Sequence, residues 1–277
     1  MVSAVGDAVT MRTRNGRNPL VVRCYRWTRT CVHLLAGVAT TMFVFPLVSD
    51  TRRRWLVKRW SGRLLRILKI EARVHGELSR GGHVLLVANH ISWLDIFALN
   101  AHHPVRFVAK AEIAKWPVVS QMVRGVGTVF IQRERRRDTH RVIQTMAGVL
   151  AAGDIVAIFP EGTTTYGDEV LPFKSSLLQP IVEVDGHVQP VAIRYRTPDG
   201  ELAMAPTYVG DTSFVESFWA VCGERALTVE LLARPALPAA EASHRRELAR
   251  LAEVSIRTAL AVPERATGSG TRGDPAA

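Results

Sequence analysis

The chain has 277 residues, enough to bury a full core in one domain with appended segments. Its formal net charge of +11 indicates an anionic partner, and a hydrophobic content of 47% favours a membrane surface over nucleic acid as that partner. Three scattered cysteines (Cys24, Cys31 and Cys222) exclude a disulfide framework and a zinc site, and favour a reducing, cytoplasmic setting.

The N-terminal part is predicted to associate with a membrane. Residues 1–30 form a basic, arginine-rich segment without a period that would pack against a core. Residues 31–48 are apolar and uncharged, and as a helix they would be about 27 Å long, barely enough to cross a bilayer. Arginines flank this run on both sides, and Gly37 and Pro46 allow a bend. We therefore prefer a re-entrant or interfacial hairpin, with both ends cytoplasmic, to a simple span.

Residues 53–70 predict an amphipathic helix, which completes a membrane-associated segment over residues 31–70. Its basic and apolar faces and its two tryptophans favour a position in the lipid headgroup layer. The alternative is a helix packed on the protein core with a solvated basic face. The predicted apolar face consists of Leu56, Val57, Trp60, Leu64, Ile67 and Leu68, and the basic face of Lys58, Arg59, Arg63, Arg66 and Lys69.

From residue 71 to residue 265 the pattern predicts one α/β domain with a mixed, largely parallel sheet flanked by helices. Residues 266–277 are predicted to be a disordered tail. The predicted strands are 71–76, 83–88, 105–108, 127–132, 155–159, 188–195 and 227–232, and the predicted helices are 93–101, 111–123, 138–152, 174–183 and 239–261.

His90 and Asp95 follow the strand 83–88, at a strand end where open α/β sheets bind ligands. A carboxylate beside an imidazole can fix its tautomer and stabilise the imidazolium, so the two residues can act as a base and its orienter. Positions five apart diverge on a regular helix, so the pair requires His90 in the turn before the helix and Asp95 in its first turn. Ser92 and Asp95 also resemble a capping box, in which Asp95 would serve only as a cap.

Three further segments follow in order: 127–133 (GTVFIQR), 159–165 (FPEGTTT) and 188–193 (VQPVAI). Together with 89–95 (NHISWLD) they resemble the four blocks of the glycerolipid and lysophospholipid acyltransferase family, typified by 1-acylglycerol-3-phosphate acyltransferases. The segment 107–112, with Trp116 and Pro117, is similar to the family's link between its first two blocks. The resemblance covers about residues 70–195.

The resemblance implies that His90 is the catalytic base and Asp95 its orienter. A thioester is already activated, so a deprotonated hydroxyl can attack it directly, and no Ser or Cys nucleophile in a G-x-S-x-G turn is present. Arg133 would grip an acceptor phosphate, and Glu161 would bind acceptor hydroxyls. The whole predicted substrate-binding set is Arg133, Glu161, Gly162, Thr163, Gly127, Phe130 and Lys110.

The implied reaction moves a fatty acyl group from acyl-CoA or acyl carrier protein to the free hydroxyl of a lysolipid, with neither metal nor further cofactor. The first acceptor to expect is 1-acyl-sn-glycerol-3-phosphate, which would give phosphatidic acid. Relatives acting on it usually have an arginine where this chain has Thr164, so lyso-ornithine lipid or another lysolipid is the alternative acceptor. The expected site of action is the cytoplasmic face of the inner membrane, with anionic lipids as partners and no nucleic acid. A non-enzymatic membrane-tethering protein is the competing hypothesis.

Overall fold

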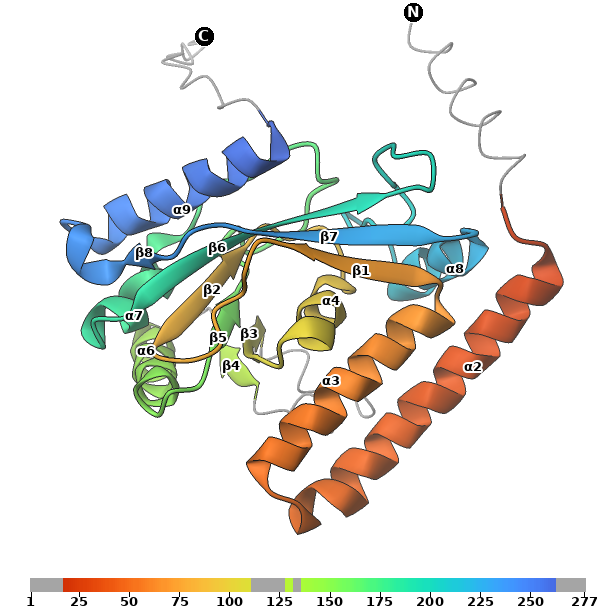
Figure 1. The fold of residues 1–277 in the computed structure, drawn as a ribbon, viewed down its shortest axis with the longest axis horizontal. Coiled ribbons are helices and arrows are strands. Elements are labelled where there is room, and N and C mark those ends of the chain that lie inside the picture. The colour runs from red at the N-terminus through yellow and green to blue at the C-terminus, as the bar shows by residue number, and fades with distance from the viewer. Residues whose placement is uncertain (1–16, 111–127, 132–135, 263–277) are drawn as a thin grey trace, which may run out of the picture.

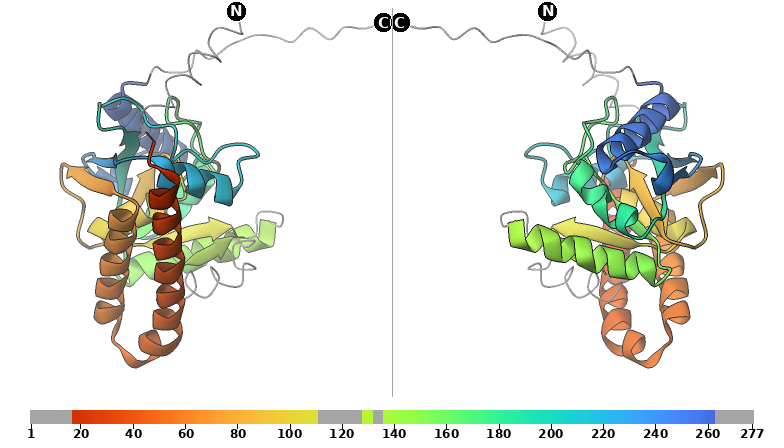
Figure 2. Two further views of the ribbon diagram at one scale, coloured as in Figure 1. Left: turned by 90° about the vertical axis from the view of Figure 1, so that its right-hand side faces the viewer. Right: turned by 90° about the vertical axis from the view of Figure 1, so that its left-hand side faces the viewer.

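The computed structural model describes residues 17–110, 128–131 and 136–262, which form an α/β body with a helical hairpin projecting from it (Figure 1). Helices cover both faces of a central sheet, so the body has three layers. Both views in Figure 2 show the hairpin extending beyond these layers.

The sheet is mixed and largely parallel, as predicted. Within the described residues it has eight strands, in the order β1-β7-β6-β2-β5-β3-β4, with β8 beside β6. Strand β6 runs antiparallel to β7 and β8, and the other neighbouring pairs are parallel. The strands are β1 (Ile70–His75), β2 (Val84–Ala88), β3 (Arg106–Lys110), β4 (Val129–Ile131), β5 (Val156–Ile158), β6 (His187–Arg196), β7 (Leu227–Ala233) and β8 (Leu237–Pro238). The seven predicted strands are confirmed with bounds that differ by no more than two residues, except that both ends of the predicted strand 127–132 lie outside the described residues. Strand β8 was not predicted.

Two apolar clusters hold the layers together. On one face of the sheet, α3 (Asp50–Ile67), α4 and α8 bury side chains such as Leu64, Leu99 and Phe218. On the other face, α6, α7 and α9 bury Met146, Ile181 and their neighbours. The helices of the body are α4 (Asp95–His102), α6 (Arg136–Ala151), α7 (Gln179–Glu183), α8 (Phe214–Gly223) and α9 (Arg245–Leu260).

The predicted helices 93–101 and 138–152 are present with shifted bounds. The predicted helix 239–261 is instead a 3₁₀ turn, Ala239–Glu241, followed after a break by α9. The predicted helix 174–183 is instead a 3₁₀ turn, Ser175–Leu178, followed by α7. Pro180 stands in the first turn of α7 and has no N–H to continue a hydrogen-bond ladder from the preceding turn. The predicted helix 111–123 and the tail 266–277 lie outside the described residues.

The N-terminal region forms a hairpin that differs from the predicted one, because the apolar run 31–48 supplies the end of one arm and the turn, and α3 supplies the other arm. Helix α2 (Leu20–Ala39) continues through a π turn, Thr40–Val44, and a 3₁₀ turn, Phe45–Leu47, before the chain reverses. Ser49 then caps α3 (Asp50–Ile67), accepting a hydrogen bond from the backbone N–H of Arg52. The two helices lie side by side, so both ends of the hairpin are on the same side of its tip (Figures 1 and 2). Gly37 stands inside α2 and does not bend the chain, and the relation of the hairpin to a membrane stays a prediction.

The prediction that residues 1–30 pack against no core is wrong for residues 20–30, because α2 begins at Leu20 and crosses the predicted boundary at residue 30. Arg26 is buried, and its guanidinium donates to the backbone carbonyls of Glu224 and Arg225, just beyond α8. These carbonyl oxygens compensate for the lost hydration of the cation. Residues 1–16 lie outside the described part of the chain.

The prediction that the apolar face of 53–70 lies among lipid headgroups is also wrong, because that face packs inside the protein. Leu64 and Leu68 are fully buried, and the ring of Trp60 stacks on His33 of α2 at 4.5 Å. The core-packed alternative therefore holds. The basic side chains of α3, among them Arg59 and Arg63, are exposed.

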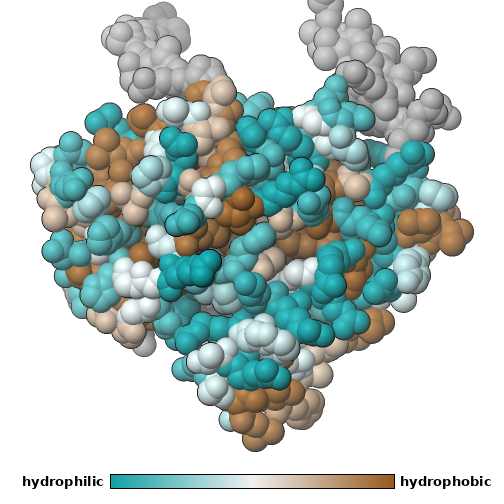
Figure 3. Space-filling view, in the orientation of Figure 1, coloured by the Kyte–Doolittle hydropathy of each residue, from teal (hydrophilic) through white to brown (hydrophobic). Residues whose placement is uncertain are grey.

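Apolar side chains remain exposed at the hairpin tip (residues 42–47), including Phe43 at 67% and Leu47 at 84%. Figure 3 shows hydrophobic side chains gathered at this tip, at the bottom of the molecule. By length and composition, the helical stretch Leu20–Leu47 could cross a membrane.

Candidate functional site

The site forms where two parallel neighbours of the sheet end. Strands β2 and β5 pair in parallel, so the loops that follow them leave the same edge of the sheet. The loop after β2 carries His90, and the loop after β5 carries Glu161. The backbone N–H of His90 donates to Glu161 Oε1 at 2.8 Å, so the two predicted site residues are in direct contact.

His90 and Asp95 meet as the chemistry requires. Helix α4 begins at Asp95 and His90 lies in the preceding turn, which removes the geometric objection to the pair. The two atoms His90 Nδ1 and Asp95 Oδ2 are 2.8 Å apart. Asp95 is completely buried, whereas 21% of the His90 side chain is exposed. A carboxylate accepts only, so Nδ1 carries the proton and Nε2 is left to accept one.

The predicted capping box is half present: Ser92 Oγ accepts from the N–H of Leu94 at 3.2 Å instead of from Asp95, while Asp95 makes the carboxylate half. Its Oδ2 accepts hydrogen bonds from the backbone N–H groups of Ile91 at 2.8 Å and Ser92 at 3.0 Å. These bonds hold the turn that carries His90. The capping role and the orienting role therefore belong to the same carboxylate.

Tyr195 completes this arrangement and was not predicted as a site residue. It is fully buried on β6, and its hydroxyl donates to Asp95 Oδ1 at 2.8 Å. Burial raises the pKa of the Tyr195 phenol well above 10, and the charge of Asp95 raises it further, so the phenol remains a donor. No local signal in the sequence marks Tyr195, because its contact depends on the register of β6 against the loop after β2.

Glu161 lies inside the protein with 3% of its surface exposed. Its second oxygen accepts from the backbone N–H of Leu171 at 3.0 Å, so both carboxylate oxygens bind backbone groups. Burial raises the pKa of Glu161 from 4.5 to about 7, although the two backbone donors favour the ionised form. The structure thus gives Glu161 a positioning role toward the His90 loop, and its predicted contact with acceptor hydroxyls stays a prediction.

The residues after Glu161 form a turn. Gly162 has a φ of +78°, a conformation that favours glycine, and its N–H donates to the carbonyl of Phe159 at 3.1 Å. Thr163 is exposed. The hydroxyl of Thr164 donates to the backbone carbonyl of Tyr208, which ties the loop after β6 to the site.

Two more side chains support the His90 turn. The ring of Phe159 stacks on the His90 imidazole at 4.1 Å, with the ring planes 10° apart. Asn89 is fully buried and pairs with the backbone of Ile193 through both its amide nitrogen at 2.9 Å and its oxygen at 2.7 Å. These contacts join the end of β2 to β5 and β6.

For four of the predicted substrate-binding residues, the described part of the structure shows no side-chain contact with the site. Arg133 and Gly127 lie outside the described residues. Lys110 is the last residue of β3, and Phe130 stands in β4, its parallel neighbour at the edge of the sheet. The structure describes only the backbone of these two positions.

The arrangement can remove a proton from a bound alcohol. An imidazole with a buried carboxylate at one nitrogen and an accessible edge is suited to general-base chemistry. Within the described residues, no group of three His, Cys, Asp or Glu side chains could hold a metal ion.

Comparison with solved structures supports the fold. A 1-acyl-sn-glycerophosphate acyltransferase from Thermotoga maritima, PlsC, superposes with a TM-score of 0.67 at 22% sequence identity, over 87% of this chain and 94% of that chain. At this identity the likeness concerns the fold alone.

Sequence comparison identifies the family. A lyso-ornithine lipid O-acyltransferase from Rhizobium meliloti is 35% identical over 90% of this chain and 92% of its own length. A 1-acyl-sn-glycerol-3-phosphate acyltransferase from Neisseria gonorrhoeae is 38% identical over 64% of this chain and 69% of its own length. The family model named Acyltransferase matches residues 71–194, the segment that carries the His90 and Glu161 loops. This chain therefore belongs to the acyltransferase family, a family of membrane-associated enzymes of lipid biosynthesis.

Proposed function

We propose that this acyltransferase moves a fatty acyl group from a thioester to the free hydroxyl of a lysolipid, with His90 as the general base. The observation that carries the proposal is the contact between His90 Nδ1 and the buried carboxylate of Asp95, whose other oxygen is held by Tyr195. It leaves Nε2 of His90 as the proton acceptor, and no described residue hydrogen-bonds to it.

The proposed reaction has two steps. Nε2 of His90 takes the proton of the lysolipid hydroxyl while its oxygen attacks the thioester carbonyl carbon. The tetrahedral intermediate then expels the thiolate as the C–S bond breaks, and the His90 imidazolium returns the proton to that sulfur. Asp95 stabilises the imidazolium between the two steps. The donor is acyl-CoA or acyl carrier protein, and no cofactor is needed because the thioester is already activated.

Two acceptors have specific support. Lyso-ornithine lipid is favoured because similarity to an enzyme named for it extends over 90% of this chain, including the hairpin region. The hydroxyl of Thr164, which is engaged with the Tyr208 carbonyl, also supplies no charge for a phosphomonoester. The second candidate is 1-acyl-sn-glycerol-3-phosphate, favoured by 38% identity to the Neisseria enzyme over 64% of this chain.

The proposed location is the cytoplasmic face of the inner membrane. The exposed apolar side chains of the hairpin tip would enter the bilayer, while both ends of the hairpin stay on the side of the α/β body. The exposed arginines of α3, such as Arg59 and Arg63, would meet anionic lipid headgroups.

The test uses the purified full chain with labelled acyl-CoA or acyl carrier protein and a panel of lysolipids. We expect product from lyso-ornithine lipid or from 1-acyl-sn-glycerol-3-phosphate, and a loss of about 10² to 10⁴ in kcat for His90→Ala. His187→Ala, at an exposed histidine of β6, is the matched control and should keep full activity. Equal turnover by His90→Ala and the wild type would refute the proposed base.

A further inference from the structure

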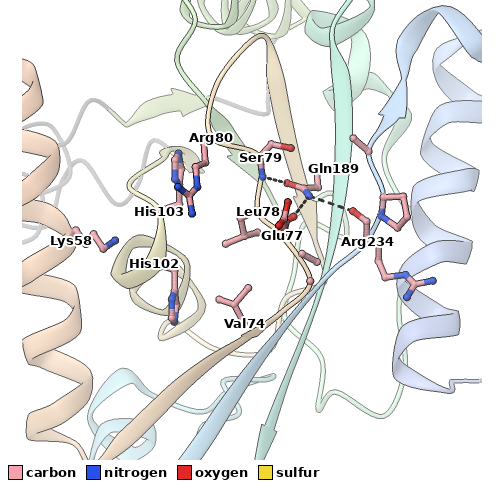
Figure 4. A pocket seen from close by; sticks show the side chains of 14 residues that line it. Lys58, Val74, Glu77, Leu78, Ser79, Arg80, His102, His103, Gln189 and Arg234 are labelled. Carbon is pink, nitrogen blue, oxygen red and sulfur yellow. Dashed lines mark hydrogen bonds between the residues drawn. The ribbon is translucent and has the colours of Figure 1, made fainter.

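A cavity of about 980 Å³ lies at the carboxyl end of α4, the helix whose first residue is Asp95 (Figure 4). Its walls come from α3, from the last residues of β1 and β7, from β6 and from the loop between β1 and β2. His90 does not line it, so this cavity is separate from the site described above. The volume is at the upper end of the range typical of small-molecule sites, roughly 300–1,000 Å³.

One wall of the cavity is fixed by Gln189. This side chain is 3% exposed, its oxygen accepts from the backbone N–H of Ser79 at 2.8 Å, and its nitrogen donates to the carbonyl of Glu77 at 2.8 Å. Gly76 lets the β1 end approach β7, because a Cβ there would lie 2.7 Å from the carbonyl oxygen of Ala233. These contacts therefore hold the loop between β1 and β2 against β6 and β7.

The opposite wall carries positive charge. Lys58 reaches into the cavity from α3, and Arg80, His102 and His103 lie on the same side (Figure 4). No described residue forms an ion pair with Lys58 or Arg80. The nearby Arg54 differs, because Asp154 pairs with it at 3.3 Å.

The positive charges on this wall lie close to His103, as their effect on its pKa shows. Burial lowers the pKa of His103 below 6.5, and the charges of Lys58, Arg80 and Arg54 lower it further. Several cations thus act on one imidazole that makes no hydrogen bond within the described residues. The carboxyl end of α4 contributes about half a negative charge, which is less than the two unpaired cations supply. Glu77 is the acidic side chain of the lining, and it lies across the cavity beside Gln189 (Figure 4).

We infer that this cavity binds a small phosphate-bearing molecule, with the phosphate between Lys58, Arg80 and His103. A phosphate offers several acceptor oxygens to an ammonium, a guanidinium and an imidazole on one wall. The rest of the ligand would lie against Val74, Leu78 and the wall held by Gln189. The phosphate belongs either to a soluble ester or to a lipid headgroup, and the experiment distinguishes the two.

The test follows the histidine resonances of the full chain by NMR in dodecyl maltoside, with the His103 signal assigned by its loss in His103→Gln. Inorganic phosphate is the soluble probe, and discs of phosphatidylglycerol bilayer are the lipid probe. A bound anion stabilises the imidazolium, so we expect the pKa of His103 to rise in a saturable manner. A rise with inorganic phosphate assigns a soluble ligand, and a rise with the lipid discs alone assigns a headgroup.

The double variant Lys58→Ala/Arg80→Ala should bind the effective probe about tenfold more weakly or worse, since it removes both cations that would donate charge-assisted hydrogen bonds to the phosphate. The matched control, Arg246→Ala/Arg250→Ala, removes the same charge from the exposed face of α9 and should bind as the wild type does. Binding of the two probes is measured on the wild type, so this part of the test does not depend on whether a variant folds. The inference is overturned if neither probe moves the His103 signal, or if the control weakens binding as much as the double variant.

Discussion

Tyr195 links the His90–Asp95 pair to the sheet. It is buried, so it cannot touch a substrate, yet its hydroxyl fixes one oxygen of the carboxylate that orients the imidazole. The other oxygen of Asp95 serves both His90 and the backbone turn. The orientation of the His90 imidazole therefore depends on hydrogen bonds through which Asp95 joins the turn before α4 to strand β6.

Tyr195→Phe is expected to lower kcat by about tenfold with little change in KM, because a hydrogen bond to a charged group contributes about 1.5–3 kcal/mol. Steady-state kinetics with a saturating donor would measure both constants. Tyr166→Phe, at an exposed tyrosine, is the control and should leave kcat unchanged. A selective rise in KM would instead place Tyr195 in acceptor binding.

Glu161→Gln is expected to change the pH dependence of stability. The folded chain holds the Glu161 proton up to about pH 7, whereas the carboxyl ordinarily titrates near 4.5. The stability that this carboxyl contributes is therefore fully present below about pH 4.5 and is lost as the pH rises through about 7. Glutamine does not titrate, so the stability of the wild type relative to the variant should fall over this range by at most about 3 kcal/mol.

Thermal unfolding of both proteins between about pH 5 and pH 8 would measure this difference. Glu241→Gln, at an exposed carboxyl, is the control and should show no such trend. A constant difference between the wild type and Glu161→Gln would contradict the assignment of a buried carboxyl that loses its proton near neutrality.

At the scale of elements, α2 and α3 are joined by a reciprocal contact. Trp60 Nε1 donates to the carbonyl of His33 at 3.1 Å, and His33 Nε2 lies 3.0 Å from the carbonyl of Trp60. Such pairing satisfies buried polar groups between two helices whose contact is otherwise apolar. It joins α2 to the face of α3 that is used inside the protein.

Trp60→Phe removes the indole donor and leaves the His33 carbonyl without this partner, so the free energy of unfolding should fall by about 1–3 kcal/mol. Trp55→Phe, at a tryptophan of the same helix that is 44% exposed, should change it by less than about 0.5 kcal/mol. Chemical denaturation in one detergent would compare the two. If both variants lower the free energy of unfolding equally, the hydrogen bond from Trp60 to His33 contributes no stability of its own.

At the scale of the whole molecule, the hairpin tip is the part that leaves the α/β body. We expect Phe43→Ser/Leu47→Ser to bind vesicles more than tenfold more weakly, because each buried side chain of this size contributes about 1.5–3 kcal/mol. Leu202→Ser/Met204→Ser, at exposed apolar residues beyond β6, is the control. Co-sedimentation with vesicles would measure binding. If the tip variant binds vesicles as strongly as the wild type, the hairpin tip is not the membrane contact.

Much of this architecture could be predicted from the sequence because local signals carry it. Alternating strands and helices predict the mixed sheet, and the spacing of His90 and Asp95 across a strand end and a helix start predicts their contact. One available signal was overlooked: Ser213 and Glu216 form the capping box that begins α8. The amphipathic pattern of 53–70 was recognised correctly but assigned to the wrong partner, because periodicity reports an apolar face and not what covers it.

The sequence by itself therefore determined the sheet type, the apolar run that ends at the hairpin turn and the contact between His90 and Asp95, since each depends on residues close together in the chain. Only the tertiary structure decided the rest. Tyr195 reaches Asp95, Arg26 reaches the end of α8, and Gln189 fixes the wall of the second cavity through contacts between residues about a hundred or more positions apart. Such contacts depend on strand register and helix packing, which arise when the whole chain folds and leave no local pattern in the sequence.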